Sequence, residues 1–164
     1  MSTERTDLIT TLDKHRGFLR QTVAGLDDQQ AARTTTVSTL CVGGLIKHVA
    51  AVEHTWRRFV EVGPQAFAEA GRTSSYEEGF RMLPGETLGG LLKEYEAVAA
   101  DTNRLIESLP SLDGDHPLPE APWFEPGARW SARRVFMHIL AETAQHAGHA
   151  DIIRESLDGA RTMG

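Results

Sequence analysis

Cysteine and long apolar runs are scarce in this chain of 164 residues. Cys41 is the single cysteine, which excludes an intramolecular disulfide and is typical of a reducing compartment. No apolar run approaches the roughly 18 residues of a membrane-spanning helix, and the opening MSTERTDLIT lacks the apolar core of a signal peptide. We therefore expect a cytoplasmic protein without a membrane partner.

Basic residues are in the minority, because 17 lysines and arginines face 23 acidic residues and leave a net charge of -6. That balance disfavours nucleic acid as a partner. Hydrophobic residues make up 40% of the chain and charged residues 24%, as in ordinary globular proteins. The length suits one domain, so we expect residues 1–164 to form a single domain that acts on a small molecule.

The alternation of apolar and polar residues that indicates strands is also missing, whereas four segments show the spacing of amphipathic helices. The expected helices cover residues 5–26, 42–62, 87–109 and 131–157. The apolar stripes of the first two consist of Leu8, Leu12, His15, Leu19, Val23 and Leu26, and of Leu45, Val49, Val52, Trp56 and Phe59. Asp27 and Asp28 open a polar break after the first helix, and Gly63-Pro64 ends the second.

Two connections between the helices are long. Residues 65–86 are irregular, with a short helix expected over residues 66–70 and with Ser74 and Ser75 as capping residues. Residues 111–130 contain four prolines, and a stiff loop of this length is often functional. The pattern predicts an all-α fold, an antiparallel-type four-helix bundle with a long crossover and a proline-rich loop before the last helix. We expect that loop to lie at the mouth of the functional site.

Polar side chains interrupt the apolar stripe of the last expected helix. Val135 and Ile139 begin the stripe, and Glu142, His146 and His149 continue it where a bundle core would bury apolar groups. Burying such groups without partners costs several kcal/mol. Glu142 and His146 are four residues apart, so they lie one turn apart on the same helix face. Two ligands at this spacing can hold one divalent ion.

A third ligand for such an ion is available on the second helix, where His48 lies on the inward side. Side chains on facing bundle helices can form a metal site. Simpler interpretations stay open, because a lone inward histidine is often a hydrogen-bonded core residue and a Glu–His pair is often a surface contact. His54 and His138 add further candidates, and His138 extends the spacing of Glu142 and His146 by one turn. The zinc-protease motif H-E-x-x-H is not matched.

Two segments carry a resemblance to a known family, GLIKHVAAVEHTWRRF in the second helix and ETAQHAGHADIIRESLDG in the last. Through them nearly the whole chain resembles the DinB/YfiT-like superfamily of metal-binding four-helix bundles. It is most similar to an uncharacterised actinobacterial branch related to the N-terminal domain of mycothiol-dependent maleylpyruvate isomerase. The resemblance implies a DinB-like bundle in which His48, Glu142 and His146 bind the metal. It also implies a supporting or pocket position for His149.

The resemblance further implies a metal-dependent enzyme, a thiol S-transferase that uses a metal-activated thiolate of the mycothiol type. Zinc is the first expectation for the ion, and nickel or another first-row ion is an alternative. The isomerase carries an additional C-terminal domain, whereas this chain ends seven residues after Leu157, so the isomerase reaction is not expected. A hydrolase using a metal-bound water, or a non-enzymatic metal-binding or stress-related bundle, remain the alternatives. Related bundles often pair, so a homodimer is expected.

Other conspicuous side chains receive structural interpretations. Trp56 is expected in the core, whereas Trp123 and Trp130 are expected either as a lid or as packing residues. His138 is expected to pack against the helices or to be exposed. Cys41 has no base at an adjacent helical position, so it is expected as a buried small residue and not as a nucleophile. A salt-bridge network closing the bundle end is expected from Asp151, Arg154 and Glu155.

Overall fold

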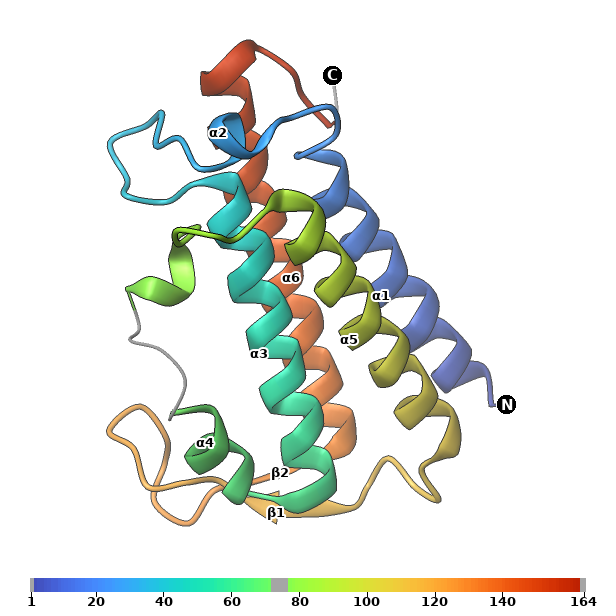
Figure 1. The fold of residues 1–164 in the computed structure, drawn as a ribbon. Helices are drawn as coiled ribbons and strands as arrows, with labels where there is room; N and C mark the ends of the chain where they lie inside the picture. Colours follow the sequence, from blue (N-terminus) through green and yellow to red (C-terminus); the bar gives the residue numbers. More distant parts are fainter. Residues whose placement is uncertain (1, 72–76, 163–164) are drawn as a thin grey trace.

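The structure, a computed structural model, describes residues 2–71 and 77–162 (Figure 1). Four long helices dominate these residues: α1 (Thr3–Gln21), α3 (Val42–Val62), α5 (Leu88–Ser108) and α6 (Ala132–Asp158). Shorter elements connect them: α2 (Asp28–Ala31), α4 (Gln65–Ala70), the one-turn helix η1 (Glu78–Phe80), and the strands β1 (Asp115–Pro117) and β2 (Arg129–Ser131). The all-α prediction is confirmed, because the two short strands form one small antiparallel sheet.

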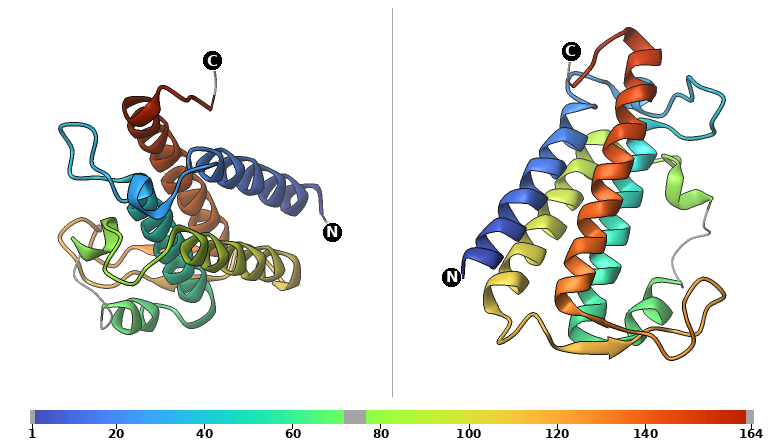
Figure 2. Two further views of the ribbon diagram at one scale, coloured as in Figure 1. Left: turned by 45° about the horizontal axis from the view of Figure 1, so that its top comes forward. Right: turned by 180° about the vertical axis from the view of Figure 1, so that it is seen from behind.

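The long helices form a four-sided bundle in which α1 packs on α6 and α5, and α3 packs on α5 and α6 (Figures 1 and 2). Helices α3 and α5 run in the same direction, as do α1 and α6, while the other two neighbouring pairs are antiparallel (Figure 2). The antiparallel prediction is therefore wrong for half of the neighbouring pairs. The physical reason is the crossover from residue 63 to residue 87, which returns the chain to the end of the bundle where α3 begins.

Hydrogen bonds at the helix ends explain where the helices begin. The Thr87 side chain accepts a bond from the backbone N–H of Gly90, and the Ser131 side chain accepts one from Arg134, each three residues on. Such N-caps satisfy backbone donors that have no partner inside the helix. The expected starts of the third and fourth long helices are thus confirmed. Gly159 ends α6 in the left-handed region with φ of 80°, as the Asp158-Gly159 signal predicted.

Three local predictions need correction. Helix α1 ends at Gln21 and not at residue 26, because a series of turns reaches Gly25, whose φ is 76°. The polar break contains the short helix α2, whose N-cap Asp27 forms a reciprocal capping box with Gln30. The proline-rich loop contains the two strands, which are too short to show alternation. The capping residues expected at Ser74 and Ser75 lie outside the described residues.

The core consists of two apolar clusters with a polar layer between them. Leu45 and Tyr95 belong to the cluster near the start of α3, and Phe59 and Phe136 belong to the other. Each long helix contributes one fully buried polar residue between the clusters, namely Arg16, Glu53, Thr102 and Thr143. The predicted stripes were one residue off here, because Arg16 and Glu53 are buried where His15 and Val52 were expected.

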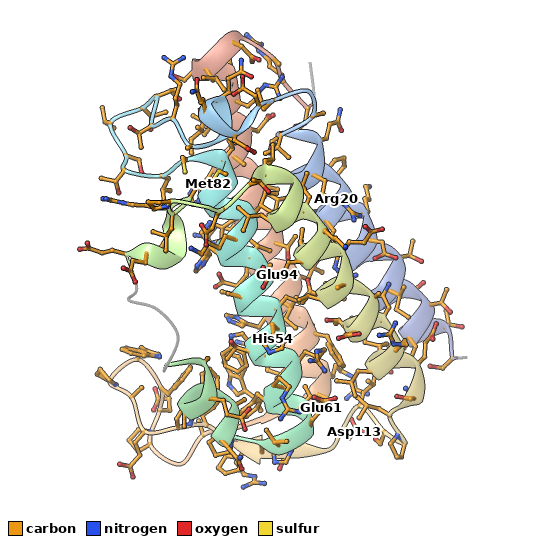
Figure 3. All side chains as sticks on the ribbon, in the orientation of Figure 1. Arg20, His54, Glu61, Met82, Glu94 and Asp113 are labelled. Carbon is orange, nitrogen blue, oxygen red and sulfur yellow. The ribbon has the colours of Figure 1, made fainter. Side chains whose placement is uncertain are left out.

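The crossover lies against the first turn of α3 because two glycines let it approach. A Cβ atom on Gly44 would overlap the backbone carbonyl of Phe80, and one on Gly43 would overlap the side chain of Met82 (labelled in Figure 3). This contact holds η1 beside α3 and places Phe80 next to the histidine one turn further along. No helix within the described residues is long and apolar enough to cross a membrane.

Candidate metal centre

Three of the predicted ligands come together where α3 and α6 face each other. His48, Glu142 and His146 each offer one ligand atom, and these atoms all lie within 4.8 Å of one another. The ring centroids of His48 and His146 are 4.8 Å apart, and Nε2 of His146 lies 3.5 Å from Oε2 of Glu142. His146 is buried, while His48 and Glu142 are partly exposed. The sequence pattern therefore identified a real cluster.

The protonation states of this cluster suit metal binding. Burial, reinforced by the nearby His146, lowers the pKa of His48 to about 4, so its ring is neutral at pH 7 and has a free lone pair. The His146 ring lowers the pKa of the Glu142 carboxyl below its ordinary value, so this group is an anion at the same pH. Deprotonated imidazole and carboxylate are the forms in which these side chains bind metals.

The spacing of the ligand atoms also fits one ion. Ligands bound to tetrahedral zinc at about 2.0–2.1 Å lie roughly 3.3–3.4 Å from one another. The separation of 3.5 Å between Glu142 and His146 is already close to that value, and a small rotation of His48 closes the set. No fourth His, Cys, Asp or Glu in residues 2–71 and 77–162 joins the cluster. The three residues therefore fit an ion that keeps at least one position open.

Two further histidines surround the cluster. Nδ1 of His149 lies 3.4 Å from Nδ1 of His146, so a proton on either nitrogen is shared along this contact. Nε2 of His138 lies 3.8 Å from the second carboxylate oxygen of Glu142, and its ring contacts the edge of Trp56 at 4.8 Å. The packing expected for His138 is thus confirmed, although the residue also faces the cluster. His54 is exposed and does not belong to it (Figure 3).

A cavity of about 770 Å³ opens from the cluster towards the proline-rich loop. His48, Glu142 and His146 line one part of it, and aromatic rings together with residues 119–121 and 123–124 of the loop line another. The expected position of this loop at the mouth of the site is therefore confirmed. Trp130 stacks on Trp56 at 4.8 Å and is a packing residue, whereas Trp123 is 76% exposed at the rim. Trp56 itself is buried, as expected.

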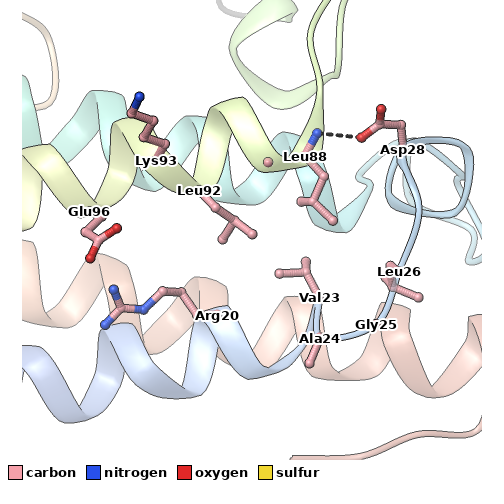
Figure 4. A pocket seen from close by; sticks show the side chains of 11 residues that line it. Arg20, Val23, Ala24, Gly25, Leu26, Asp28, Leu88, Leu92, Lys93 and Glu96 are labelled. Carbon is pink, nitrogen blue, oxygen red and sulfur yellow. Dashed lines mark hydrogen bonds between the residues drawn. The ribbon is translucent and has the colours of Figure 1, made fainter.

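A separate cavity of about 580 Å³ lies at the end of α1 beside the start of α5 (Figure 4). Val23, Leu88 and Leu92 give it apolar walls, and Arg20 and Glu96 lie at one side (Figure 4). It contains none of the three clustered ligands, and we assign no chemistry to it.

The two remaining structural expectations have clear outcomes. Cys41 is buried, and its Sγ accepts a hydrogen bond from the backbone N–H of Gly44 at 3.4 Å, which confirms the structural interpretation. Arg154 pairs with Asp158 and donates to the backbone carbonyls of Thr22 and Ala24. The bundle end is therefore closed by Arg154, although its partners are not the residues expected.

Comparison with known proteins identifies the family. A family model described as mycothiol-S-transferase matches residues 7–159. The chain belongs to this DinB-like family. No curated protein matches the chain.

A likeness to a solved structure supports the fold. The structure described as a conserved protein of locus from Enterococcus faecalis is 15% identical and has a TM-score of 0.75. The likeness covers 98% of this chain and 99% of that chain. At this identity the likeness shows the fold alone, and the fold is the bundle described above.

Sequence reasoning missed parts of the site that depend on the crossover. The ring of Phe80 stacks on the ring of His48 at 3.9 Å with an interplanar angle of 21°. Phe80 lies in a segment without periodicity, so only the glycine pair Gly43-Gly44 hinted at a close approach there. The predicted stripe also placed Glu142 inside the core, whereas the core position belongs to Thr143 and Glu142 faces the cavity edge.

Proposed function

We propose that the protein is a metal-dependent thiol S-transferase that joins a thiol of the mycothiol type to a small electrophile. The observation that carries the proposal is the partly exposed cluster of His48, Glu142 and His146 at the edge of a cavity, in a chain of the mycothiol-S-transferase family. Two imidazoles and one carboxylate suit zinc, and nickel fits the same donor set.

In this proposal His48, Glu142 and His146 hold the ion. An ion with an open position supplies a positive charge that favours the thiolate form of a thiol, which is the nucleophilic form. The thiol loses its proton to solvent, the sulfur electron pair forms a carbon–sulfur bond, and the leaving group departs with the electrons of the bond that breaks. A ligand set without a fourth protein side chain in the described residues supports this use over a structural one.

The neighbouring histidines take positioning roles in this proposal. A histidine that binds a metal usually donates its other ring N–H to a second group, which fixes its orientation. His149 lies where it can accept that proton from His146, across 3.4 Å. His138 lies 3.8 Å from Glu142 and can hold its carboxylate in place. Loss of either side chain is expected to weaken the site without removing a ligand.

The experiment combines metal analysis with a transfer assay. Purified protein is loaded with zinc, its metal content is measured, and it is mixed with mycothiol and chlorodinitrobenzene. We expect about one zinc per chain, and a conjugate that forms together with released chloride. His146→Ala should lose both the zinc and the conjugate, whereas Arg104→Ala, which removes an exposed arginine on α5, should lose neither.

Three results would overturn the proposal in different ways. Undiminished transfer by metal-free His146→Ala would exclude the metal from the reaction. Full zinc content without a conjugate, across a series of electrophiles, would favour a non-enzymatic metal-binding bundle. Ester hydrolysis by the zinc-loaded protein without added thiol would favour the hydrolase.

A further inference from the structure

Two cavities reach the candidate metal centre from different sides. The first is the cavity of about 770 Å³ described above, and the second, of about 430 Å³, is lined by His146 together with His149. Among the described residues, only Phe80 and His146 line both cavities. Because Phe80 stacks on His48 at 3.9 Å, its ring separates the two cavities beside the cluster. Both volumes fall in the range of about 300–1,000 Å³ that is typical of small-molecule sites.

The larger cavity has a wall of aromatic rings opposite the cluster. Besides Phe80, it is lined by Trp56, Phe67, Trp123 and Phe124. The Trp56 ring meets Phe67 edge-on at 4.9 Å and Phe124 edge-on at 6.4 Å, so these rings support one another. Ring faces and edges of this kind bind planar, apolar groups and offer few hydrogen bonds. This cavity therefore suits an aromatic molecule.

The smaller cavity carries hydrogen-bonding side chains. Its lining includes Ser38, Thr39, Arg81 and His149, with Glu77 and Leu40 beside them. The guanidinium of Arg81 is exposed and forms no ion pair with the residues that the structure describes. The backbone of Arg81 is nevertheless held, because Lys47 donates to its carbonyl at 3.3 Å. Hydroxyl groups and a guanidinium can donate to and accept from a ligand rich in hydroxyl and amide groups.

We propose that these cavities are separate subsites of one reaction, a thiol subsite and an electrophile subsite. In the thiol subsite, Arg81, Ser38 and Thr39 bind the hydroxyl- and amide-bearing body of the thiol, whose sulfur points past His149 to the cluster. In the electrophile subsite, the aromatic rings bind an electrophile with an aromatic ring. The inference rests on the proposed function and names the substrate class for each side of the same centre.

Physical reasons favour this assignment over the reverse. A hydroxyl-rich thiol against the aromatic wall would lose hydrogen bonds to water without replacing them, which is costly for each buried group. Two reactants held on different sides of one centre also meet in a fixed orientation, which speeds a reaction between two molecules. The partition by Phe80 keeps the bodies of the two reactants apart, while His146 is reached from both sides.

The test measures binding as well as turnover, with one exposed residue changed in each subsite. Mycothiol binding to the zinc-loaded protein is followed by calorimetry. Dinitrobenzene, which lacks a leaving group, is followed by quenching of tryptophan fluorescence. Arg81→Ala should weaken mycothiol binding about tenfold and leave dinitrobenzene binding unchanged. Trp123→Ala should weaken dinitrobenzene binding about fivefold, reported by the two remaining tryptophans, and leave mycothiol binding unchanged. Arg104→Ala serves as the control for loss of an exposed arginine.

The outcomes separate this inference from the proposed function. If Trp123→Ala weakens mycothiol binding and Arg81→Ala weakens dinitrobenzene binding, the assignment is reversed and the inference is wrong. If neither variant changes either affinity while the conjugate still forms, the subsites lie elsewhere and the transferase proposal stands. If both variants act as expected but no electrophile yields a conjugate, the subsites stand and the transferase proposal fails.

Discussion

Two polar clusters lie inside this bundle, and they differ in charge balance and in access to solvent. Arg16 and Glu53 are both fully buried, and their opposite charges pair between α1 and α3. His48, Glu142 and His146 are also clustered, but they carry one carboxylate and two imidazoles and open into cavities. The first cluster satisfies itself, whereas the second has ligand capacity left over.

The difference teaches how to distinguish a structural polar cluster from a binding site. Arg16 donates from Nε to Glu53 at 3.2 Å, and its other nitrogens reach Asp13 at 2.7 Å and Asn103 at 2.8 Å. With every donor directed at a protein acceptor, Arg16 joins α1 to α3 and α5 and has no group left for a ligand. The metal cluster lacks such complete pairing and lies at a cavity edge, which is typical of a functional site.

The largest expected effect comes from breaking the buried pair. Arg16→Met leaves the Glu53 carboxylate buried without its partner, which should lower the free energy of unfolding by about 3–5 kcal/mol. For a domain of this size the melting temperature should fall by roughly 6–20 °C. Thermal unfolding followed by circular dichroism measures this change.

The matched control replaces both partners. The double variant Arg16→Met/Glu53→Leu should recover most of the stability, because a buried pair can be replaced by apolar side chains at little cost. Both variants, measured below their melting temperatures, should still bind zinc. If the pair is broken without loss of stability but with loss of zinc, the two clusters are not separate and the comparison is wrong.

The next effect in size comes from removing the ion. Because α3 and α6 bring the ligands together only in the folded chain, an ion present at a thousandfold excess over its Kd should stabilise the fold by about 4 kcal/mol. Chelation should then lower the melting temperature by roughly 8–16 °C, and added zinc should restore it. His48→Ala should abolish most of this shift, whereas His149→Ala should retain most of it. The opposite pattern would move the ion along α6 towards His149.

A smaller effect tests how the crossover supports the metal cluster. Replacing a helical glycine by alanine normally stabilises a helix by about 1 kcal/mol. Gly44→Ala should instead destabilise the protein by about 1–3 kcal/mol, because its Cβ overlaps the carbonyl of Phe80. It should also weaken zinc binding, since Phe80 stacks on His48. Gly89→Ala on α5, where nothing lies within 4 Å of the added Cβ, is the control and should stabilise. Urea unfolding of both variants measures the two signs.

The smallest effect comes from an ion pair at the surface, which contrasts with the buried pair. Arg133 bonds to Glu4 and Asp113 and lowers the pKa of both carboxyls from their ordinary values of 4.5 and 3.8. Because these pKa values are lowered on folding, the contribution to stability is present at neutral pH and is lost as the pH falls through the folded values. Arg133→Ala should thus be slightly less stable than the parent at pH 7 and equally stable near pH 2. A stability difference that grows on acidification would contradict this.

The sequence by itself determined the helices and the members of the metal cluster. Helical spacing and caps are local properties, so the third and fourth long helices begin at Thr87 and Ser131 as predicted. Polar residues in an apolar stripe are conspicuous for the same reason, and Glu142 and His146 were visible at their spacing of one turn. His48 needed the family resemblance to stand out from His54, because a single helix position does not show what faces it.

Only the tertiary structure decided which polar groups meet across the bundle. Arg16 and Glu53 are 37 residues apart, and each looks like an ordinary surface charge until α1 and α3 pack together. Phe80 reaches His48 because the crossover returns along α3, and the two cavities that meet at His146 exist only because η1 and the proline-rich loop approach from different sides. Burial and cavity shape depend on contacts between distant segments, and one-dimensional periodicity carries no information about such contacts.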